Sequence, residues 1–133
     1  AVNAFLLELF DLFEARPVRY SVSLTEAARS VRMFLEELRN RLSEPWTVRG
    51  MAEACGMGTT HFTRHVQRVA GESPARHLLR LRLDMASRRL KAEPRTPVAE
   101  VARGAGFAHP SYFIRVFVQR YGCTPAVWRR QAQ

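Results

Sequence analysis

Residues Thr96–Arg130 have the sequence TPVAEVARGAGFAHPSYFIRVFVQRYGCTPAVWRR, which predicts a short helix, a glycine turn and a second helix with basic and aromatic positions. A related pattern occurs about half a chain earlier, over Thr47–Arg80. Repeats of this kind indicate that one supersecondary unit has been used more than once. The chain therefore carries one structural unit twice.

The two copies align residue by residue, with one extra residue in the turn of the second copy. The aligned pairs are Val48 and Val98, Ala52 and Ala102, Gly56 and Gly106, Phe62 and Phe113, Arg64 and Arg115, Gly71 and Gly122, and Pro74 and Pro125. A helix that ends at a glycine and is soon followed by another helix is typical of the helix-turn-helix motif, whose second helix can enter the major groove of DNA. Two copies in register predict this motif more strongly than one.

The runs MGTTHFTRHVQRVAGESPARHLLRLRLDMASRRL and VAEVARGAGFAHPSYFIRVFVQRYGCTPAVWRR together resemble the DNA-binding domain of the AraC/XylS family of bacterial transcription regulators. The resemblance covers roughly residues 25 to 131 and includes Arg82, Ala86 and Leu90 of the helix between the two units. It implies an all-α fold with two helix-turn-helix subdomains joined by a long connecting helix. The function that it implies is sequence-specific binding of double-stranded DNA to regulate transcription.

The composition suits a chain that binds nucleic acid. With 133 residues and a net charge of +9, the protein is one domain, or two small units that share a core. From Thr47 onward lie 15 of the 21 basic residues but only 5 of the 12 acidic ones. All basic residues except Lys91 are arginine, which suits both phosphates and guanine edges. A generally solvated, arginine-rich surface is the alternative, and the repeat favours the nucleic-acid interpretation.

The two cysteines and the apolar pattern indicate a chain of the reducing cytoplasm. Cys55 and Cys123 fall in no metal-binding spacing and form no disulfide framework. No secretion signal and no apolar run near 20 residues is present, so we expect no membrane span. The chain starts without Met, which suggests a piece of a longer protein or a processed chain.

Residues 1–22 form a segment distinct from the DNA-binding domain predicted over residues 23–133. The run AVNAFLLELFDLF is apolar almost all round a helix, which must bury most of its sides. Many members of the family carry an effector-binding and dimerisation domain before the DNA-binding part. Residues 1–15 are then the end of such an upstream domain or a helix that forms a homodimer, or else an extra helix on the DNA-binding core. Pro17–Val22 is predicted to be a linker.

The first helix-turn-helix is predicted over residues 47–70, after a helix that runs from a capping box at Ser23–Glu26 to about Leu42. Thr47 caps a helix to about Cys55, and the recognition helix runs from about Thr60 to Val69. At 100° per residue its apolar side chains point one way and its polar ones the other. The outward residues are Thr60, Thr63, Arg64 and Gln67, and the family pattern places Thr60, Thr63 and Arg64 at bases and Thr59 and Arg68 near phosphate. An ordinary solvated face is the alternative for each threonine and for Gln67.

A connecting helix is predicted over residues 74–91, opened by Ser73 and Pro74 as cap and first helical residue. Leu78, Leu81, Met85 and Leu90 are expected to pack both units against it. Its length of roughly 27 Å suits two recognition helices in adjacent major grooves, which lie about 34 Å apart. The second helix-turn-helix is predicted over residues 96–121, with Thr96 and Pro97 as its cap and first helical residue. Thr124 and Pro125 open a closing helix that Trp128 anchors.

On the second recognition helix, Phe113, Val116 and Phe117 are predicted to be buried. The residues predicted to face outward are Ser111, Ile114, Arg115 and Val118, and His109 and Pro110 in the preceding turn complete the candidate DNA-binding set. Ile114 and Val118 suit contact with thymine methyl groups. A mildly apolar surface is the equal alternative, because single exposed aliphatic residues are common.

Other functions have weaker support in the sequence. His61 and His65 lie four residues apart, but they lack a third ligand, so phosphate contact or packing is favoured over a zinc site. We find no nucleophile with an arranged base and expect neither enzymatic activity nor a cofactor or metal. A basic helical module that binds RNA or a protein partner such as RNA polymerase is the alternative function. RNA polymerase is also an expected partner of a transcription regulator.

Overall fold

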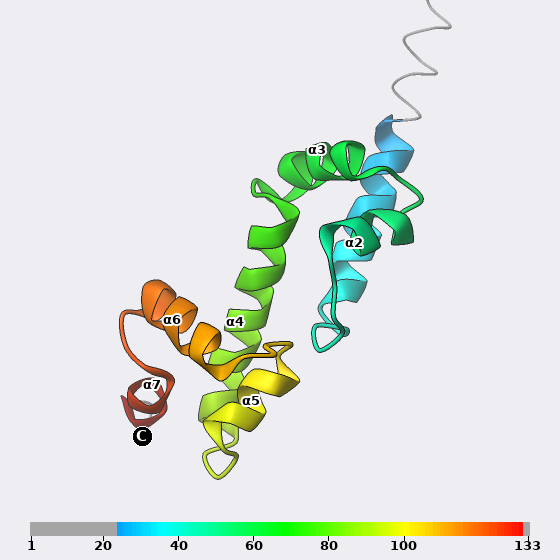
Figure 1. Cartoon of the computed structure of the whole chain (residues 1–133). Coiled ribbons are helices and arrows are strands. Elements are labelled where there is room, and N and C mark those ends of the chain that lie inside the picture. Colours follow the sequence, from blue (N-terminus) through cyan, green and yellow to red (C-terminus); the bar gives the residue numbers. More distant parts are fainter. Residues whose placement is uncertain (1–23, 132–133) are drawn as a thin grey trace, which may run out of the picture.

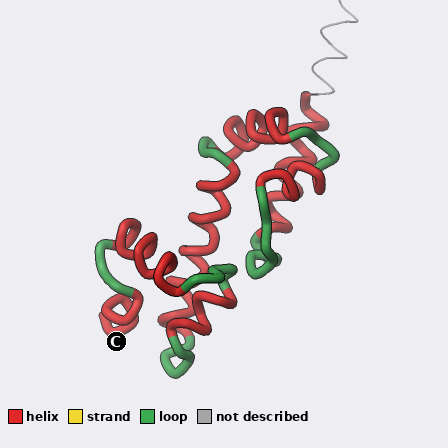
Figure 2. The backbone as a smooth tube through the Cα atoms, viewed as in Figure 1, coloured by secondary structure: helices red, strands yellow, loops and turns green. Residues whose placement is uncertain are grey.

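The computed structural model describes residues 24–131. The predicted N-terminal helix over residues 1–15, the linker Pro17–Val22 and Ser23 of the capping box lie outside this part. Within it, every regular element is a helix and no strand occurs (Figure 2). The prediction of an all-α fold is confirmed.

The first unit consists of a helix over residues 24–38, α2 (Val48–Ala54) and α3 (Thr59–Ala70). Thr47 caps α2 as predicted, because its hydroxyl accepts a hydrogen bond of 2.9 Å from the amide of Gly50. The core of this unit joins Val31, Leu38, Met51, Phe62 and Val66, which are all at most 1% exposed, with Leu78 and Leu81 of the next helix. Phe62 stacks edge-on against Phe34 and thereby fastens α3 to helix 24–38.

The helix predicted to reach about Leu42 ends at Leu38 instead. Beyond that residue the amides of Asn40 and Arg41 bond to carbonyls only three residues back, which is turn geometry. A carbonyl group of the following loop is paired outside a helix, because the carbonyl of Arg41 accepts a hydrogen bond of 2.8 Å from the Trp46 indole. Leu42 is nevertheless buried, so its apolar spacing signalled burial rather than helix.

Helix α4 (Pro74–Ala92) connects the two units and is the longest of the helices α2 to α7. Ser73 caps it with a hydroxyl that accepts from the amide of Arg76 at 3.3 Å, as predicted. Figure 1 shows α3 crossing one end of α4, whereas α6 (Pro110–Tyr121) lies beside the other half. The recognition helices are thus held at different heights along one straight element.

The second unit contains α5 (Val98–Gly104), α6 and α7 (Pro125–Gln131). Its core joins Leu83, Ala86 and Leu90 of α4 with residues of all three helices, including Val101, Phe113 and Phe117, each fully buried. Met85 packs against the cores of both units, as the connecting-helix pattern predicted. Thr124 caps α7, since its hydroxyl accepts from the amide of Val127 at 3.3 Å.

The predicted cap at Thr96 is wrong. Pro97 takes the cap position of α5 with φ −56° and ψ 142°, and no side chain caps this helix. The Thr96 hydroxyl instead donates to the Glu93 carboxylate at 3.2 Å, because Glu93 closes the turn after α4 and also accepts from Arg89. Among residues 24–131, no helix combines the length and the apolar character needed to cross a membrane.

Candidate nucleic-acid interface

The first half of the candidate interface is the outward face of α3. Thr59, Thr60, Arg64, Gln67 and Arg68 are exposed, while Phe62 and Val66 on the opposite face are fully buried. Because the buried pair fixes the rotation of the helix about its axis, the polar residues are presented together on one side. The predicted division of this helix into two faces is confirmed, and contact with DNA stays a prediction.

Thr63 is less available to a ligand than its neighbours. Its side chain is half-buried, and its hydroxyl donates a hydrogen bond of 2.7 Å to the carbonyl of Thr59 in the preceding turn. With the hydroxyl hydrogen used inside the helix, Thr63 presents lone pairs and a methyl group rather than a donor.

The second half is the outward face of α6, where Ser111, Ile114, Arg115 and Val118 are exposed as predicted. Ile114 is 41% and Val118 is 37% exposed, which makes them two of the few large apolar side chains on the described surface. His109 is the cap residue and Pro110 the first residue of α6, so both lie at its N-terminal end, exposed.

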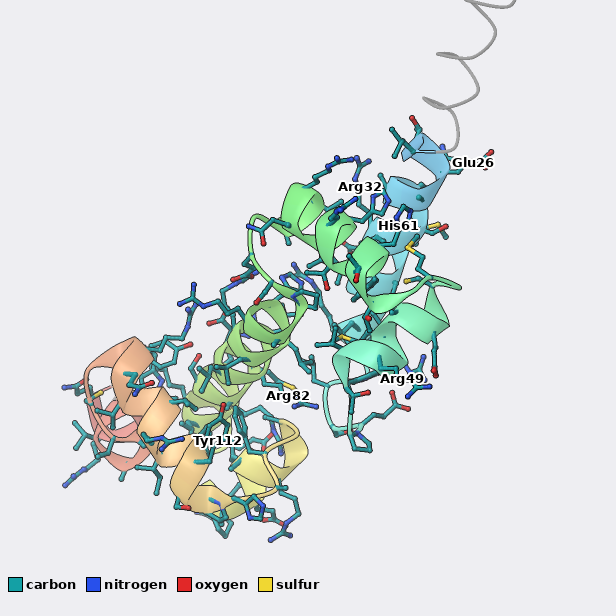
Figure 3. The ribbon with its side chains drawn as sticks, turned by 45° about the horizontal axis from the view of Figure 1, so that its top comes forward. Glu26, Arg32, Arg49, His61, Arg82 and Tyr112 are labelled. Carbon is teal, nitrogen blue, oxygen red and sulfur yellow. The ribbon has the colours of Figure 1, made fainter. Side chains whose placement is uncertain are left out.

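The two aligned arginines differ in their surroundings. The Arg115 guanidinium lies over the ring of Tyr112, 5.4 Å from its centroid, a cation–π contact along one side of α6. Arg64 makes no hydrogen bond, ion pair or ring contact with any residue of the described chain. Tyr112, labelled on α6 in Figure 3, is 41% exposed and was not predicted as a site residue. Its spacing of three from Arg115 is the sequence signal that marks it.

Polar contacts anchor the C-terminal end of α6 to α4. The Asp84 carboxylate accepts hydrogen bonds from the Tyr121 hydroxyl at 2.7 Å and from Arg120 at 3.0 Å, and the Trp128 indole donates to the carbonyl of Ser87 at 3.1 Å. The Arg120 side chain is therefore held in an ion pair within the protein. Because this end is held and Phe113 and Phe117 are fully buried, the exposed face of α6 has a fixed direction.

A second set of polar contacts holds the corner between α3 and α4. Glu72 accepts from Arg80 at 2.8 Å and lies 3.0 Å from a ring nitrogen of His77. Burial alone would raise the pKa of the Glu72 carboxyl, but the bonds from Arg80 and His77 outweigh it and hold this pKa below its usual value. The carboxylate therefore stays charged and paired.

A shallow hollow of about 400 Å³ lies between these two anchors, on the surface shared by α4 and α6. Its positive lining residues include Arg80 and Arg120, which are ion-paired, and Arg76, which is exposed and whose side chain has no partner in residues 24–131. Sequence reasoning missed Arg76. The signal was present, because Arg76 and Arg80 are four residues apart and share a face of the connecting helix.

Outside the interface, the sequence also singles out a pair of histidines and Cys55. The rings of His61 and His65 lie 4.8 Å apart, and no group of three potential metal ligands exists in the part of the chain that the structure describes. Burial, together with the positive charges of His61 and Arg68, lowers the pKa of His65. Burial raises the pKa of the Cys55 thiol, which packs against the first core. Cys55 thus has the environment of a packing residue, not of an activated nucleophile.

Comparison with known proteins gives a consistent result. A family model described as "Helix-turn-helix domain" matches residues 51–131. The RCS-specific HTH-type transcriptional activator RclR of Escherichia coli is 29% identical over 99 residues, which are 74% of this chain and 34% of the relative. The chain thus spans about a third of the length of the first curated relatives that it matches.

Two solved structures show the same fold. The DNA-binding domain of the global transcriptional factor AdpA, solved in complex with a target DNA, superposes with a TM-score of 0.73 and 26% identity, covering 76% of this chain and 90% of that one. A transcriptional regulator from Chromobacterium violaceum, described among AraC-type DNA-binding domain-containing proteins, gives a TM-score of 0.71 at 18% identity, over 81% of this chain and 96% of that one. The arrangement of helices around α4 is therefore shared with these domains.

Proposed function

The chain belongs to the AraC/XylS family of helix-turn-helix DNA-binding domains, and from this premise we propose that it binds duplex DNA sequence-specifically and regulates transcription. Helices α3 and α6 enter successive major grooves on one side of the duplex. Arg64 and Arg115 contact guanine edges, and the exposed residues around them contact the neighbouring bases and phosphates.

The observation that carries this proposal is the matched pair of recognition helices. α3 and α6 each contain 12 residues, end at a glycine with positive φ, bury two or more apolar residues fully or nearly so, and expose an arginine at the aligned position. Both are fastened to one helix, which keeps their separation constant. A surface with two such faces at a fixed separation suits DNA, whose major groove presents an equivalent stretch once in every helical turn.

Phosphate contacts supply the affinity that does not depend on sequence. Arg68 at the C-terminal end of α3 and Arg76 at the start of α4 are exposed, and no residue of the described chain pairs with either side chain. The net charge of +9 adds a general attraction to nucleic acid. Binding therefore weakens as salt rises, with a slope set by the number of phosphates contacted.

An RNA-binding function has less support. RNA-binding modules commonly stack bases on exposed aromatic rings. Here Phe62, Phe113 and Phe117 are fully buried, and the exposed ring of Tyr112 is covered on one side by Arg115.

The proposal extends to partners beyond DNA. The relatives are about three times as long as the matched region, which supports a longer whole protein, and we place an effector or dimerisation domain upstream of the DNA-binding part. RNA polymerase in the cytoplasm is the partner expected of a transcription regulator. The apolar sequence of residues 1–15 suits self-association. Sedimentation with and without residues 1–15 tests the last point, since an unchanged monomer contradicts it.

Selection of bound duplexes from a random pool tests the central proposal. We expect a consensus with two short conserved blocks about 10 to 10.5 base pairs apart, centre to centre. A pool that shows no enrichment, or that enriches single-stranded or RNA competitors instead, contradicts the proposed function.

A further inference from the structure

Arg82 lies where the two units meet. Its Nε donates a hydrogen bond of 3.0 Å to the carbonyl of Leu42, and one of its terminal nitrogens donates at 2.7 Å to the carbonyl of Glu44. Both carbonyls belong to the loop between helix 24–38 and α2. A side chain of the connecting helix thus fastens the first unit through two bonds, and Figure 3 shows Arg82 between α4 and this loop.

Gly106, in the turn of the second unit, contacts the same place. A Cβ at this position would overlap the carbonyl oxygen of Leu42 and the guanidinium of Arg82. A loop of the first unit, α4 and a turn of the second unit therefore converge on one point. Beside it lies a cleft of about 400 Å³, lined by Trp46 from the first unit and Tyr112 from the second. The cleft keeps Trp46 and Tyr112 apart, so the two units touch at Arg82 over a small area only.

The repeat supplies an internal comparison. Gly56 occupies the aligned position in the first unit and has a similar left-handed backbone, with φ of 67° against 97° for Gly106. A Cβ on Gly56 would meet nothing within 4 Å. The turn itself explains a glycine in both copies, whereas close approach to the other unit is a property of Gly106 alone.

The chemistry of Arg82 suits a geometric role. The residue is half-buried, and two backbone carbonyl dipoles stabilise its positive charge, since no carboxylate pairs with it in residues 24–131. Burial accordingly lowers the pKa of its guanidinium, which nevertheless stays charged. The planar guanidinium can bond two carbonyls at once, whereas one ammonium group cannot reproduce this fork.

The opposite face of α4 carries the complementary support. Arg80 and Asp84 lie two residues either side of Arg82, which places them about 160° around the helix from it. They form the middle of a chain of ion pairs that joins Glu72 at the α3–α4 corner to Arg120 at the end of α6. The two units are thus held from both sides of the connecting helix.

We propose that Arg82, packed against Leu42 and Gly106, is a positioning residue that fixes α3 relative to α6 and so makes the protein selective for the spacing between two DNA half-sites. This inference rests on the proposed two-groove function. Each half-site is contacted within one unit, so loss of the support leaves single-site binding intact and widens the range of spacings that are tolerated.

The test compares spacing selectivity among variants of the full chain. The selected duplex is rebuilt with the two blocks one base pair closer and one base pair further apart, and once with a single block. For Arg82→Met and Gly106→Ala, we expect the ratio of affinities for the best and the shifted spacing to fall at least fivefold, about 1 kcal/mol. Affinity for the single-block duplex stays within about twofold. Arg82→Lys gives a smaller fall, and Gly56→Ala keeps the wild-type ratio.

A distance measurement provides a readout that does not depend on DNA. Spin labels at Ala54→Cys on α2 and Ala99→Cys on α5, in a background without Cys55 and Cys123, report the separation of the units. The distance distribution should broaden with Arg82→Met and Gly106→Ala but not with Gly56→Ala. The proposal is overturned if Arg82→Met and Gly106→Ala leave both the distance distribution and the spacing ratio unchanged. It is also overturned if Gly56→Ala lowers the spacing ratio as much as these two variants do.

These outcomes also separate the inference from the function on which it rests. If the wild-type protein binds one block and prefers no spacing, the two-groove function fails. The distance distributions then decide alone whether Arg82 fixes the units.

Discussion

Truncating the two aligned arginines should reduce sequence discrimination and leave general DNA binding almost unchanged. A bidentate contact between arginine and guanine contributes about 1 to 3 kcal/mol of discrimination. Arg64→Ala or Arg115→Ala should therefore weaken binding to the selected duplex by about 5- to 150-fold. Binding to a shuffled duplex should change by no more than about twofold, because only one of many positive charges is removed.

The structure predicts which of the two substitutions, Arg64→Ala or Arg115→Ala, causes the larger loss of affinity. Arg115 is already held over the Tyr112 ring, whereas the side chain of Arg64 has no partner in the described residues. Ordering a free arginine side chain costs up to about 2 kcal/mol, and this cost offsets part of what its contact contributes. Arg115→Ala should accordingly cause the larger loss. Tyr112→Leu should reproduce part of that loss, since it removes the ring that orients the guanidinium.

Fluorescence anisotropy with the selected and the shuffled duplex at one salt concentration measures both quantities. Arg29→Ala is the charge-matched control, because Arg29 is an exposed residue of helix 24–38 and belongs to neither recognition helix. The double variant should be additive within about 0.5 kcal/mol, since the two arginines act in different units. If an arginine variant weakens the selected and the shuffled duplex by the same factor, that arginine does not contact bases.

Three further outcomes follow from the structure. Replacing thymine by deoxyuridine in the block bound by α6 should weaken binding about fourfold for each thymine methyl that contacts Ile114 or Val118, at about 0.8 kcal/mol each. Competition assays should show a smaller loss in the α3 block, where threonine methyl groups take the place of these aliphatic side chains. Phe113→Ala should lower the free energy of unfolding in urea by about 3 to 5 kcal/mol, since this ring is fully buried; a loss below 1 kcal/mol contradicts its place in the core. Because the pKa of His65 is lower in the folded chain than its ordinary 6.5, the unfolded chain binds more protons, and thermal stability should fall as pH drops from 7 to 5. His65→Leu should flatten that pH profile, and His61→Ala should flatten it less, because the burial of His65 remains the largest cause of its lowered pKa.

Most of the architecture could be predicted because the repeat supplies its own control. One copy of the helix-glycine-helix pattern is ambiguous, whereas aligned residues such as Phe62 and Phe113 test the same face twice. The buried and exposed sides of α3 and α6 follow directly from 3.6 residues per turn. The caps at Thr47, Ser73 and Thr124 were equally accessible, because each is a hydroxyl residue just before a helix.

What the sequence did not reveal depends on partners distant in the chain. Helix 24–38 ends early because loop carbonyls bond to Trp46 and Arg82, one of them 40 residues away from its donor. Thr96 looks like a cap in isolation, yet Glu93 takes its hydroxyl. Gly106 resembles Gly56 in sequence, and only the fold shows that it touches the other unit. Local pattern predicts local structure, and contacts between the units lie beyond its reach.

The apolar pattern of α4 determines how the units are set against each other. Leu78 and Leu81 belong to the first core, whereas Leu83, Ala86 and Leu90 belong to the second. At 100° per residue the two sets point in directions roughly 140° apart around the helix. Each recognition helix is packed on its own core, so the angle between α3 and α6 follows from this spacing of residues along α4. One residue inserted between the two sets would rotate the second unit by about 100° and advance it by about 1.5 Å, so Arg82, the Leu42 carbonyl and Gly106 could no longer meet at one point. The positions of the leucines along α4 therefore determine how far apart the two recognition helices lie. The proposed two-groove binding requires this separation to match the distance between successive turns of the major groove.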